Sequence, residues 1–199
     1  MARQTVGVGA IQADASVMAR VAQQDATVWR VLADQQLGRV LLLAKRMLGN
    51  HHEAEDVTQE AFIRLWRQAS HWTGEARIST WLYRVVHNLC IDRLRRHHGG
   101  LEDEESMEEP VESLFAPAWE SPLVHLEQSE QRQILNEAMA RLPLRHRTAL
   151  VLVYVLGLHS AEAALVMRIG EDAMASLLVR SRRRLRLLLT PWRDELLGK

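Results

Sequence analysis

Apolar residues recur at helical spacing between about residues 26 and 98 and predict three helices joined by short turns. Gly49-Asn50 is a stop signal after the first helix, and a turn around residues 71–75 follows the second. Ser79 or Thr80 can cap the third. The predicted helices run from about Ala26 to Leu48, from about Glu53 to Ala69, and from about residue 79 or 80 to the break at Gly99-Gly100.

The helical period returns near the end of the chain, after a stretch of different composition. Residues 101–130 hold ten acidic residues, three prolines and no Lys or Arg. Such a stretch cannot bury enough apolar surface to order itself, so it predicts a flexible acidic linker. Residues 1–24 are small and polar without a sustained period, and they predict a mobile tail. Further helices are predicted at about 124–141, 145–156, 160–168 and 171–189.

Composition supports an all-α fold of two small helical domains. The chain holds 30 Leu, 23 Ala and 23 Arg, which favour helices, while aromatic residues make up only 5%. The predicted organisation is a tail over residues 1–24, a domain over 25–98, the acidic linker over 99–126 and a second domain over 127–199.

The charge balance excludes a globally basic nucleic-acid binder. Lys and Arg number 25 and Asp and Glu also number 25, so attraction to nucleic acid has to come from local segregation of charge. Residues 141–199 hold ten Arg and one Lys against five acids. The single cysteine, Cys90, excludes a disulfide framework, and the longest apolar run, residues 149–158, is shorter than the ~20 residues of a membrane span. We expect a soluble cytoplasmic protein without membrane insertion.

The third predicted helix and the turn before it carry groups that suit nucleic acid. Arginines at helical spacing suit phosphates, and an asparagine among them suits a base edge. Aromatic rings beside cations suit the stacking of an unpaired base. The alternative is that the tryptophans belong to the core and the arginines form a solvated helix end. The residues concerned are Trp72, Arg77, Trp81, Arg84, Asn88, Asp92, Arg95 and Arg96.

The last helices follow a helix-turn-helix plan, in which the second helix enters the major groove of DNA. Arg180, Arg183 and Arg184 cluster on one face of that helix, although any small Leu- and Ala-rich bundle shows similar turns. Metal binding is not expected, since His51-His52, His87 with Cys90, and His97-His98 do not assemble four ligands at a familiar spacing. No phosphate-binding loop or catalytic motif occurs, so neither a cofactor nor enzymatic activity is expected.

Two stretches resemble region 2 of bacterial RNA polymerase sigma factors of the extracytoplasmic-function (ECF) group. They are residues 48–67 (LGNHHEAEDVTQEAFIRLWR) and residues 74–96 (GEARISTWLYRVVHNLCIDRLRR). Residues 141–150 (RLPLRHRTAL) look like the start of region 4 of that group. The resemblance covers about residues 26–96 and 130–189.

The resemblance implies partners and roles. Core RNA polymerase would be bound through the clamp helices of its largest subunit and the flap of its second-largest subunit, and an anti-sigma factor would silence the protein. The residues implied to bind core polymerase are Asp56, Gln59, Glu60, Arg64, Leu65 and Trp66. Those implied to bind and melt the minus-ten promoter element are Trp72, Arg77, Trp81, Arg84, Asn88, Asp92, Arg95 and Arg96. Those implied to bind the upstream, minus-thirty-five element are Ser176, Arg180, Arg183 and Arg184.

Departures from the ECF pattern concentrate in region 4. Ala175 and Leu177 stand where Lys and Arg are usual, and neither can hydrogen-bond a guanine edge, although a leucine could still touch a thymine methyl group. Glu171 and Asp172 would repel phosphate at the start of the same helix. Ala163 replaces a larger hydrophobic residue, Arg168 replaces a turn glycine, and Ile78 in region 2 replaces an aromatic residue.

Three functions are compatible with these observations; the intact-looking region 2 favours the first, and the altered region 4 helix keeps the second open. The first is a sigma factor that joins core RNA polymerase and directs promoter-specific initiation under anti-sigma control. The second is a sigma-like decoy or adaptor, whose altered region 4 binds a protein in place of DNA. The third is a free-standing helix-turn-helix regulator.

Overall fold

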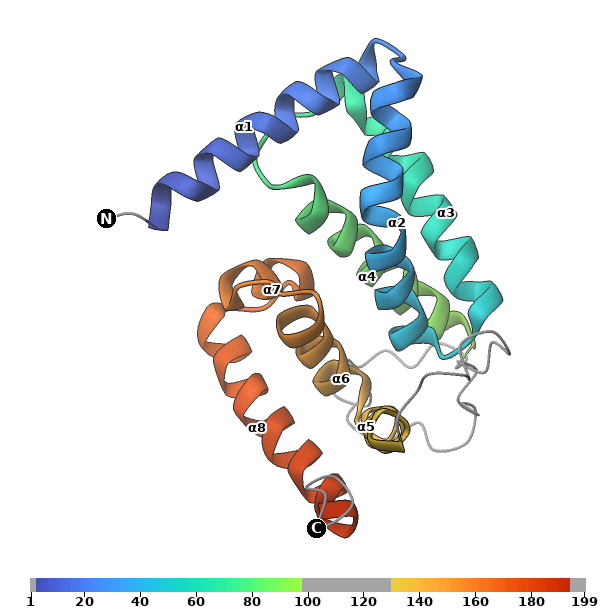
Figure 1. The fold of residues 1–199 in the computed structure, drawn as a ribbon, viewed down its shortest axis with the longest axis vertical. Coiled ribbons are helices and arrows are strands. Elements are labelled where there is room, and N and C mark those ends of the chain that lie inside the picture. The colour runs from blue at the N-terminus through green and yellow to red at the C-terminus, as the bar shows by residue number, and fades with distance from the viewer. Residues whose placement is uncertain (1–2, 98–129, 194–199) are drawn as a thin grey trace.

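The structure, a computed structural model, describes residues 3–97 and 130–193. Every regular element among these residues is a helix. The all-α prediction is confirmed. Figure 1 shows α1 to α4 before residues 98–129 and α5 to α8 after them. The elements are α1 (Arg3–Ala22), α2 (Ala26–Leu48), α3 (His51–Gln68), η1 (Ala69–His71), α4 (Ile78–His97), α5 (Glu130–Ala140), α6 (Leu144–Leu150), η3 (Val151–Val155), α7 (Ser160–Met167), α8 (Glu171–Leu189) and η4 (Thr190–Trp192).

The ends of α2 and α3 follow from capping residues in the sequence. The Asp25 carboxylate accepts hydrogen bonds from the first amides of α2, those of Thr27 and Val28. Gly49 ends α2 in the left-handed conformation, at φ 70°, which favours glycine, and its N–H donates to the Lys45 carbonyl. The next residue, Asn50, caps α3 by accepting from the Glu53 amide at 3.2 Å. The predicted stop signal is therefore also the start of the next helix.

The helices before residues 98–129, α1 to α4, form the first group. Within it, α2, α3 and α4 contact one another and enclose a core. The inward stripe of α3 contains Val57, Ala61 and Leu65, at the spacing expected of one helix face. Helix α4 contributes Leu82 and Val86, which are fully buried. This bundle spans residues 26–97 and confirms the three predicted helices.

The prediction of a mobile tail over residues 1–24 is wrong for the part of the chain that forms α1. This helix covers residues 3–22, and its Met18 and Val21 are buried against the rest of the first group. Alanines give the segment high helix propensity but only a weak hydrophobic period, which explains the misassignment. Besides α2, it packs on the η1 turn, which lies about 50 residues later in the sequence and could not be identified from local pattern.

The start of α4 also differs from the prediction. The helix begins at Ile78, so neither Ser79 nor Thr80 acts as its cap. The Ile78 N–H instead donates to the Asp14 carboxylate of α1, at 2.8 Å. A side chain distant in the sequence thus takes the place of a local capping residue.

The second group consists of the helices α5 to α8, and in it α5, α6 and α7 all pack on α8. Met174, Leu177 and Leu178 of α8 face inward. The helix predicted at 145–156 divides into α6 and the π-helix η3, where the Leu156 N–H donates to the Val151 carbonyl at 2.9 Å. The predicted helix at 124–141 is described only from residue 130, as α5. The predicted acidic linker over 99–126 lies outside the described residues.

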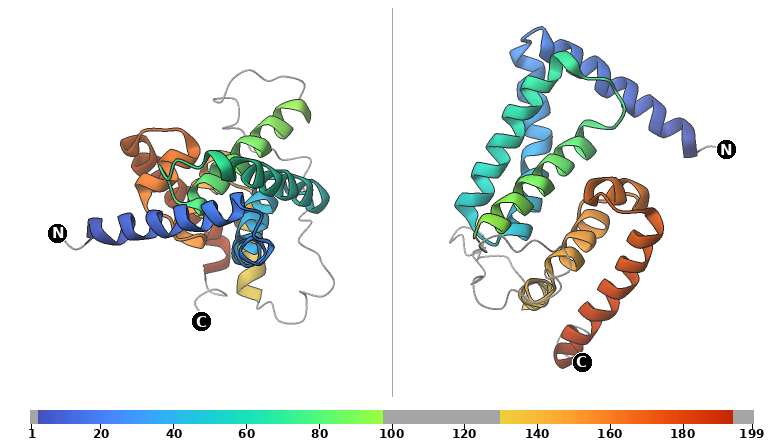
Figure 2. Two further views of the ribbon diagram at one scale, coloured as in Figure 1. Left: turned by 90° about the horizontal axis from the view of Figure 1, so that it is seen from above. Right: turned by 180° about the vertical axis from the view of Figure 1, so that it is seen from behind.

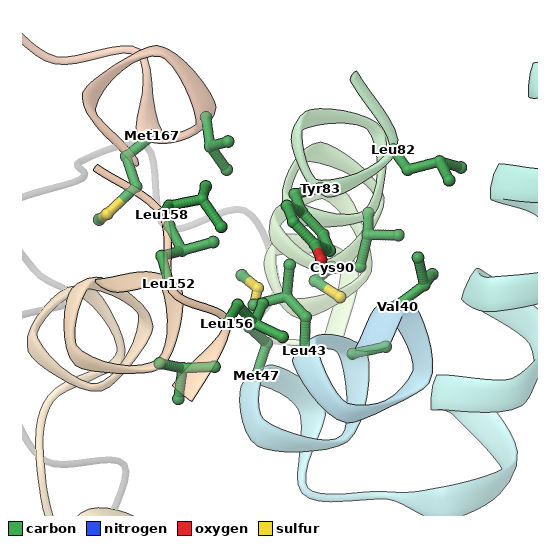
Figure 3. Close-up of a cluster of buried hydrophobic side chains, with 14 of the residues drawn as sticks. Val40, Leu43, Met47, Leu82, Tyr83, Cys90, Leu152, Leu156, Leu158 and Met167 are labelled. Carbon is green, nitrogen blue, oxygen red and sulfur yellow. The ribbon is translucent and has the colours of Figure 1, made fainter. Parts of the chain in front are cut away.

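The two groups pack against each other through a continuous buried cluster. Helix α7 contacts α4, while α6 and η3 contact α2. Both views in Figure 2 keep α6 and α7 beside the first group. Figure 3 shows the side chains of the cluster, with Leu43, Met47, Tyr83 and Cys90 from the first group and Leu152, Leu156, Leu158 and Met167 from the second.

Arginines add polar contacts to this interface. Arg147 of α6 donates to the Ala140 carbonyl at the end of α5, at 2.9 Å, and to the Met47 carbonyl near the end of α2, at 3.4 Å. Both acceptors lie at helix C-termini, where the helix dipole favours a cation. Burial lowers the pKa of Arg147 to about 10, with a further contribution from Arg46, so the guanidinium remains charged at neutral pH. Arg46 itself donates to the Asn136 side chain at 2.8 Å.

Arg39 provides a test of this packing, because its guanidinium donates to the Leu156 carbonyl of the second group. A hydrogen bond from a charged donor contributes about 1.5–3 kcal/mol, and the exposed position of Arg39 puts this bond at the lower end of that range. We expect Arg39→Ala to speed amide hydrogen exchange in η3 and α7 by about tenfold. Arg30→Ala, at an exposed position of the same helix, is the control and should leave exchange unchanged. Equal exchange in both variants would show that Arg39 does not hold the groups together.

Candidate polymerase and nucleic-acid interface

The outer face of α3 carries five of the six residues implied to bind core polymerase. Asp56, Gln59 and Arg64 are exposed, and Glu60 is half-buried. Arg64 Nε donates to Glu60 Oε1 at 2.8 Å, one helical turn apart. Asp56 lies 3.4 Å from Arg93 Nη1 of α4. This face presents both signs of charge within a rigid helix.

Leu65 is the exception, and the expectation that it docks on a partner is wrong. Its side chain is fully buried, one turn after Ala61 on the inward stripe of α3. Trp66, the next residue, is 39% exposed and lies at the edge of the surface. The two neighbours point in different directions because successive residues of a helix are 100° apart.

An apolar groove of about 750 Å³ runs between α2 and α3. The Trp29 ring lies edge-on to Trp66, with ring centroids 5.0 Å apart, and to Phe62, at 6.0 Å. The α2 side of this groove was not predicted from the sequence. Its signal in the sequence is a second apolar stripe on α2, which lies beside the buried stripe of Leu32, Val40 and Leu43. This second stripe consists of Trp29, Ala33, Leu37 and Leu41.

The residues implied to bind the minus-ten element begin in the turn before α4. Gly74 adopts φ 70° in this turn, which favours glycine. Trp72 and Trp81 contact each other edge to face, with ring centroids 6.1 Å apart. Both are half-buried and pack on the core, so the two alternatives for these tryptophans are not exclusive. Part of each ring supports the fold, and part remains open to solvent.

Helix α4 continues this surface with its polar face. Arg84, Asp92, Arg95 and Arg96 are exposed, as is Arg77 in the preceding turn, while Asn88 is half-buried. The opposite stripe of the helix, at Thr80, Tyr83, Cys90 and Leu94, is buried. The structure therefore brings the predicted residues together along one side of α4, next to the tryptophan pair.

The arginines of α8 line a shallow pocket of about 280 Å³. Arg180, Arg183 and Arg184 are joined there by Leu187 and by His146 of α6. Ser181 Oγ donates to the Leu177 carbonyl at 2.7 Å, so it accepts from His146 Nδ1 at 2.9 Å. In the neutral imidazole this leaves His146 Nε2 as an acceptor, 3.5 Å from Arg184 Nη1. His146 was missed because its role depends on a helix 35 residues later.

In the first half of α8, only one of the two positions that depart from the family pattern faces solvent. Ala175 and Ser176 are exposed, but Leu177 is 4% exposed and packs in the core. Contact between Leu177 and a thymine methyl group is therefore excluded in this fold. Glu171 and Asp172 occupy the first turn and are exposed. Arg168 adopts φ 54°, a left-handed conformation that costs a non-glycine residue about 1–2 kcal/mol.

Among the described residues, no group of three or more His, Cys, Asp or Glu is placed to hold a metal ion. Burial raises the pKa of the Cys90 thiol well above its ordinary value. His51 and His97 lie near carboxylates instead, at 3.2 Å from Glu55 and 3.4 Å from Glu53. None of the helices described here is both long and apolar enough to span a bilayer.

Comparison with known proteins identifies two family regions in the chain. Residues 32–99 match Sigma-70 region 2, and residues 132–185 match Sigma-70 region 4. The chain is 32% identical over 176 residues to the ECF RNA polymerase sigma factor SigW of Bacillus subtilis, covering 84% of this chain and 91% of SigW. It is 34% identical over 142 residues to SigM of the same organism, covering 71% and 83% of the two chains.

Solved structures share the fold at lower identity. The structure of CnrH in complex with the cytosolic domain of CnrY matches with a TM-score of 0.64 and 20% identity, covering 89% of this chain and 97% of the other. The sigma factor RpoE in complex with the anti-sigma factor NepR from Bartonella quintana matches with a TM-score of 0.63 and 19% identity, covering 80% and 95%.

Proposed function

The chain belongs to the ECF group of RNA polymerase sigma factors, and from this we propose that it binds core RNA polymerase and directs initiation at specific promoters under anti-sigma control. One observation carries the proposal at the level of residues. Region 2 presents an apolar groove edged by charges and, on α4, an arginine-rich face beside a tryptophan pair. These two surfaces suit a protein partner and an unpaired DNA strand, respectively.

We assign core binding to the outer face of α3 and the groove beside it. An apolar groove between two helices suits the apolar face of a partner helix, and charges at its edge add orientation. The family resemblance implies that this partner is the pair of clamp helices of the largest polymerase subunit. Trp29, Leu37 and Ile63 extend the surface proposed from sequence, which now comprises Asp56, Gln59, Glu60, Arg64 and Trp66 without Leu65.

We assign recognition and melting of the minus-ten element to α4 and the turn before it. Stacking of an unpaired base needs a partly exposed aromatic ring, which Trp72 and Trp81 supply. The arginines beside them suit the strand's phosphates, and Asn88 suits a base edge. The remaining residues of this proposed surface are Arg77, Arg84, Asp92, Arg95 and Arg96.

Region 4 is proposed to contact upstream DNA mainly through charge. Ser176, Arg180, Arg183 and Arg184 share one side of α8, whereas Ala175 offers no hydrogen bond to a base. In the family this region also sits on the flap of the second-largest subunit. The decoy and free-standing regulator hypotheses are not favoured, because both family regions occur in order along the chain.

The two regions have to separate for this function. Elements centred near minus ten and minus thirty-five lie about 25 base pairs apart, or about 85 Å along B-DNA. Regions that share a buried cluster cannot reach both elements at once. The groove between α2 and α3 remains open while α6 and α7 cover other faces of α2 and α4, so core polymerase can bind region 2 first.

The proposal covers domains, chemistry and location as well. We propose domain bounds of 25–98 for region 2 and 127–199 for region 4. Because α1 packs on region 2, we add this helix to the N-terminal side of the first domain. The relatives are sigma factors, and we propose that this chain likewise supplies specificity and melting while core polymerase performs catalysis, without a cofactor of its own. We also propose that it acts in the cytoplasm, together with core polymerase and DNA.

Replacement of Trp81 separates stacking from a purely structural role. We expect Trp81→Ala to raise the free-energy barrier to open-complex formation by about 1–3 kcal/mol, the energy of stacking one base, and so to slow this step. The affinity of the closed complex should stay unchanged. Trp192→Ala, at a partly exposed tryptophan of η4, is the control. The two steps are measured by stopped-flow fluorescence and gel shift. A fall in melting temperature with no kinetic effect would assign Trp81 to the core alone.

The function itself is tested by run-off transcription. Purified core polymerase is mixed with genomic fragments, with and without this protein. We expect discrete transcripts that require the protein and that share a sequence element near minus ten. Absence of any protein-dependent transcript, despite a stable complex with core polymerase, would favour the decoy.

A further inference from the structure

Helix α1 contacts the segment that leads into α4. Its Met18 and Val21 are buried, and α1 packs on η1, just before Trp72. A Cβ atom at Gly74 would lie 3.8 Å from Ala15 Cβ, in ordinary van der Waals contact. Figure 1 shows the connection between α3 and α4 passing beneath α1. The N-terminal helix is therefore a neighbour of the whole turn that carries the proposed minus-ten surface.

Asp14 makes the polar contact between α1 and α4. Its Oδ2 atom accepts the Ile78 N–H at 2.8 Å, across 64 residues of sequence. The first amides of a helix have no partner within the helix and need one from outside. The residue in the capping position is Arg77, whose carbonyl accepts from Trp81 N–H at 3.0 Å. Its guanidinium has no acceptor atom, so it cannot cap the helix, and Asp14 supplies the missing group.

The position of this contact links it to the tryptophan pair. Trp81 follows Ile78 by three residues and lies on the first turn of α4, and Trp72 contacts Trp81. A carboxylate at a helix N-terminus also interacts favourably with the helix dipole. Asp14 therefore contacts the first turn of α4, the turn that also carries Trp81 of the tryptophan pair.

We propose that Asp14 is a positioning residue for promoter melting, which makes α1 part of the minus-ten unit. The proposal rests on the proposed function of region 2. Asp14 touches no DNA in it; the residue acts through the first turn of α4. Asp14 also borders a groove of about 420 Å³ between α1, α2 and the start of α4, so shortening its side chain leaves room for water and does not disturb a packed core.

The test compares three variants with the full-length wild type. Asp14→Ala removes the acceptor, Asp14→Asn keeps an acceptor oxygen without the charge, and Asp34→Ala removes an exposed carboxylate of α2 as the control. The measurements are the rate of open-complex formation with core polymerase, the affinity for core polymerase, and amide exchange at residues 78–81 in the free protein.

We expect Asp14→Ala to slow open-complex formation by about tenfold, which is the size expected for the loss of a helix cap. Exchange at residues 78–81 should rise, affinity for core polymerase should stay within about twofold of wild type, and Asp14→Asn should recover most of the rate. These effects should be absent in Asp34→Ala.

Three results would overturn the proposal. Equal opening rates in Asp14→Ala and Asp34→Ala would show that the cap does not matter for melting. An equal loss of affinity for core polymerase would show that Asp14 only stabilises region 2. Absence of open complexes with the wild-type protein would remove the proposed function itself, and exchange at residues 78–81 would then report on the cap alone.

Discussion

Exchanging the charges of Glu60 and Arg64, as Glu60→Arg with Arg64→Glu, is expected to weaken binding to core polymerase by about 3 kcal/mol, or about a hundredfold. The two side chains pair within α3 at 2.8 Å, so the exchanged residues can pair again and the helix keeps its support. What changes is the pattern of charge that α3 presents to a partner. Interfacial charges left facing like charges account for the expected loss.

A second exchange provides the matched control. Arg30 and Asp34 of α2 have the same spacing and opposite charges, are exposed, and do not line the groove. Arg30→Asp with Asp34→Arg should leave the affinity for core polymerase within about twofold. Both proteins should keep wild-type circular dichroism. Unaltered affinity in the Glu60 and Arg64 exchange, measured by titration with labelled protein, would remove α3 from the core-binding surface.

Scrambling the minus-ten element of a responsive promoter is expected to abolish transcription, whereas scrambling the upstream element should reduce it only modestly. A good bidentate contact to a base contributes about 1–3 kcal/mol of discrimination. On α8, Ala175 is exposed but has no hydrogen-bonding side chain, and Leu177 is buried and cannot reach a base, so neither residue supplies such a contact. Arg180, Arg183 and Arg184 supply charge for phosphates, which makes upstream binding steeply dependent on salt but weakly dependent on sequence.

Run-off transcription from the two scrambled templates, at two salt concentrations, measures this prediction. A template with both elements intact is the reference, and a template scrambled between the elements is the control. A strict upstream requirement, with single-base changes each costing tenfold or more, would mean that Ser176 or another part of region 4 reads bases directly.

Most of region 2 could be predicted because its local signals agree. The Gly49-Asn50 stop signal and the inward stripe of α3 placed two helices to within about two residues. The same approach failed for α1, whose partner η1 is distant in sequence and whose small side chains carry little hydrophobic period. Local capping rules also failed at Ile78, where the acceptor Asp14 comes from another helix.

The packing of region 4 on region 2 could not be derived from periodicity alone. Tyr83 and Cys90 form a second buried stripe on α4, beyond the stripe of Leu82 and Val86 that faces its own bundle. The sequence shows that both stripes are apolar but not which surface covers the second. Leu65 was misassigned for a different reason: its docking role was taken from motif similarity, although its spacing puts it on the inward stripe of α3 with Val57 and Ala61.

Permanganate footprinting of a promoter found by run-off transcription tests the central claim most directly, because the reagent oxidises unpaired thymines much faster than paired ones. With core polymerase and this protein together, thymines from within the minus-ten element to the start site should react, and neither component alone should produce that pattern. Trp81→Ala should reduce the signal, and Trp192→Ala should not. A stable complex of protein, core polymerase and promoter in which these thymines remain unreactive would contradict the claim that α4 and the turn before it melt the promoter.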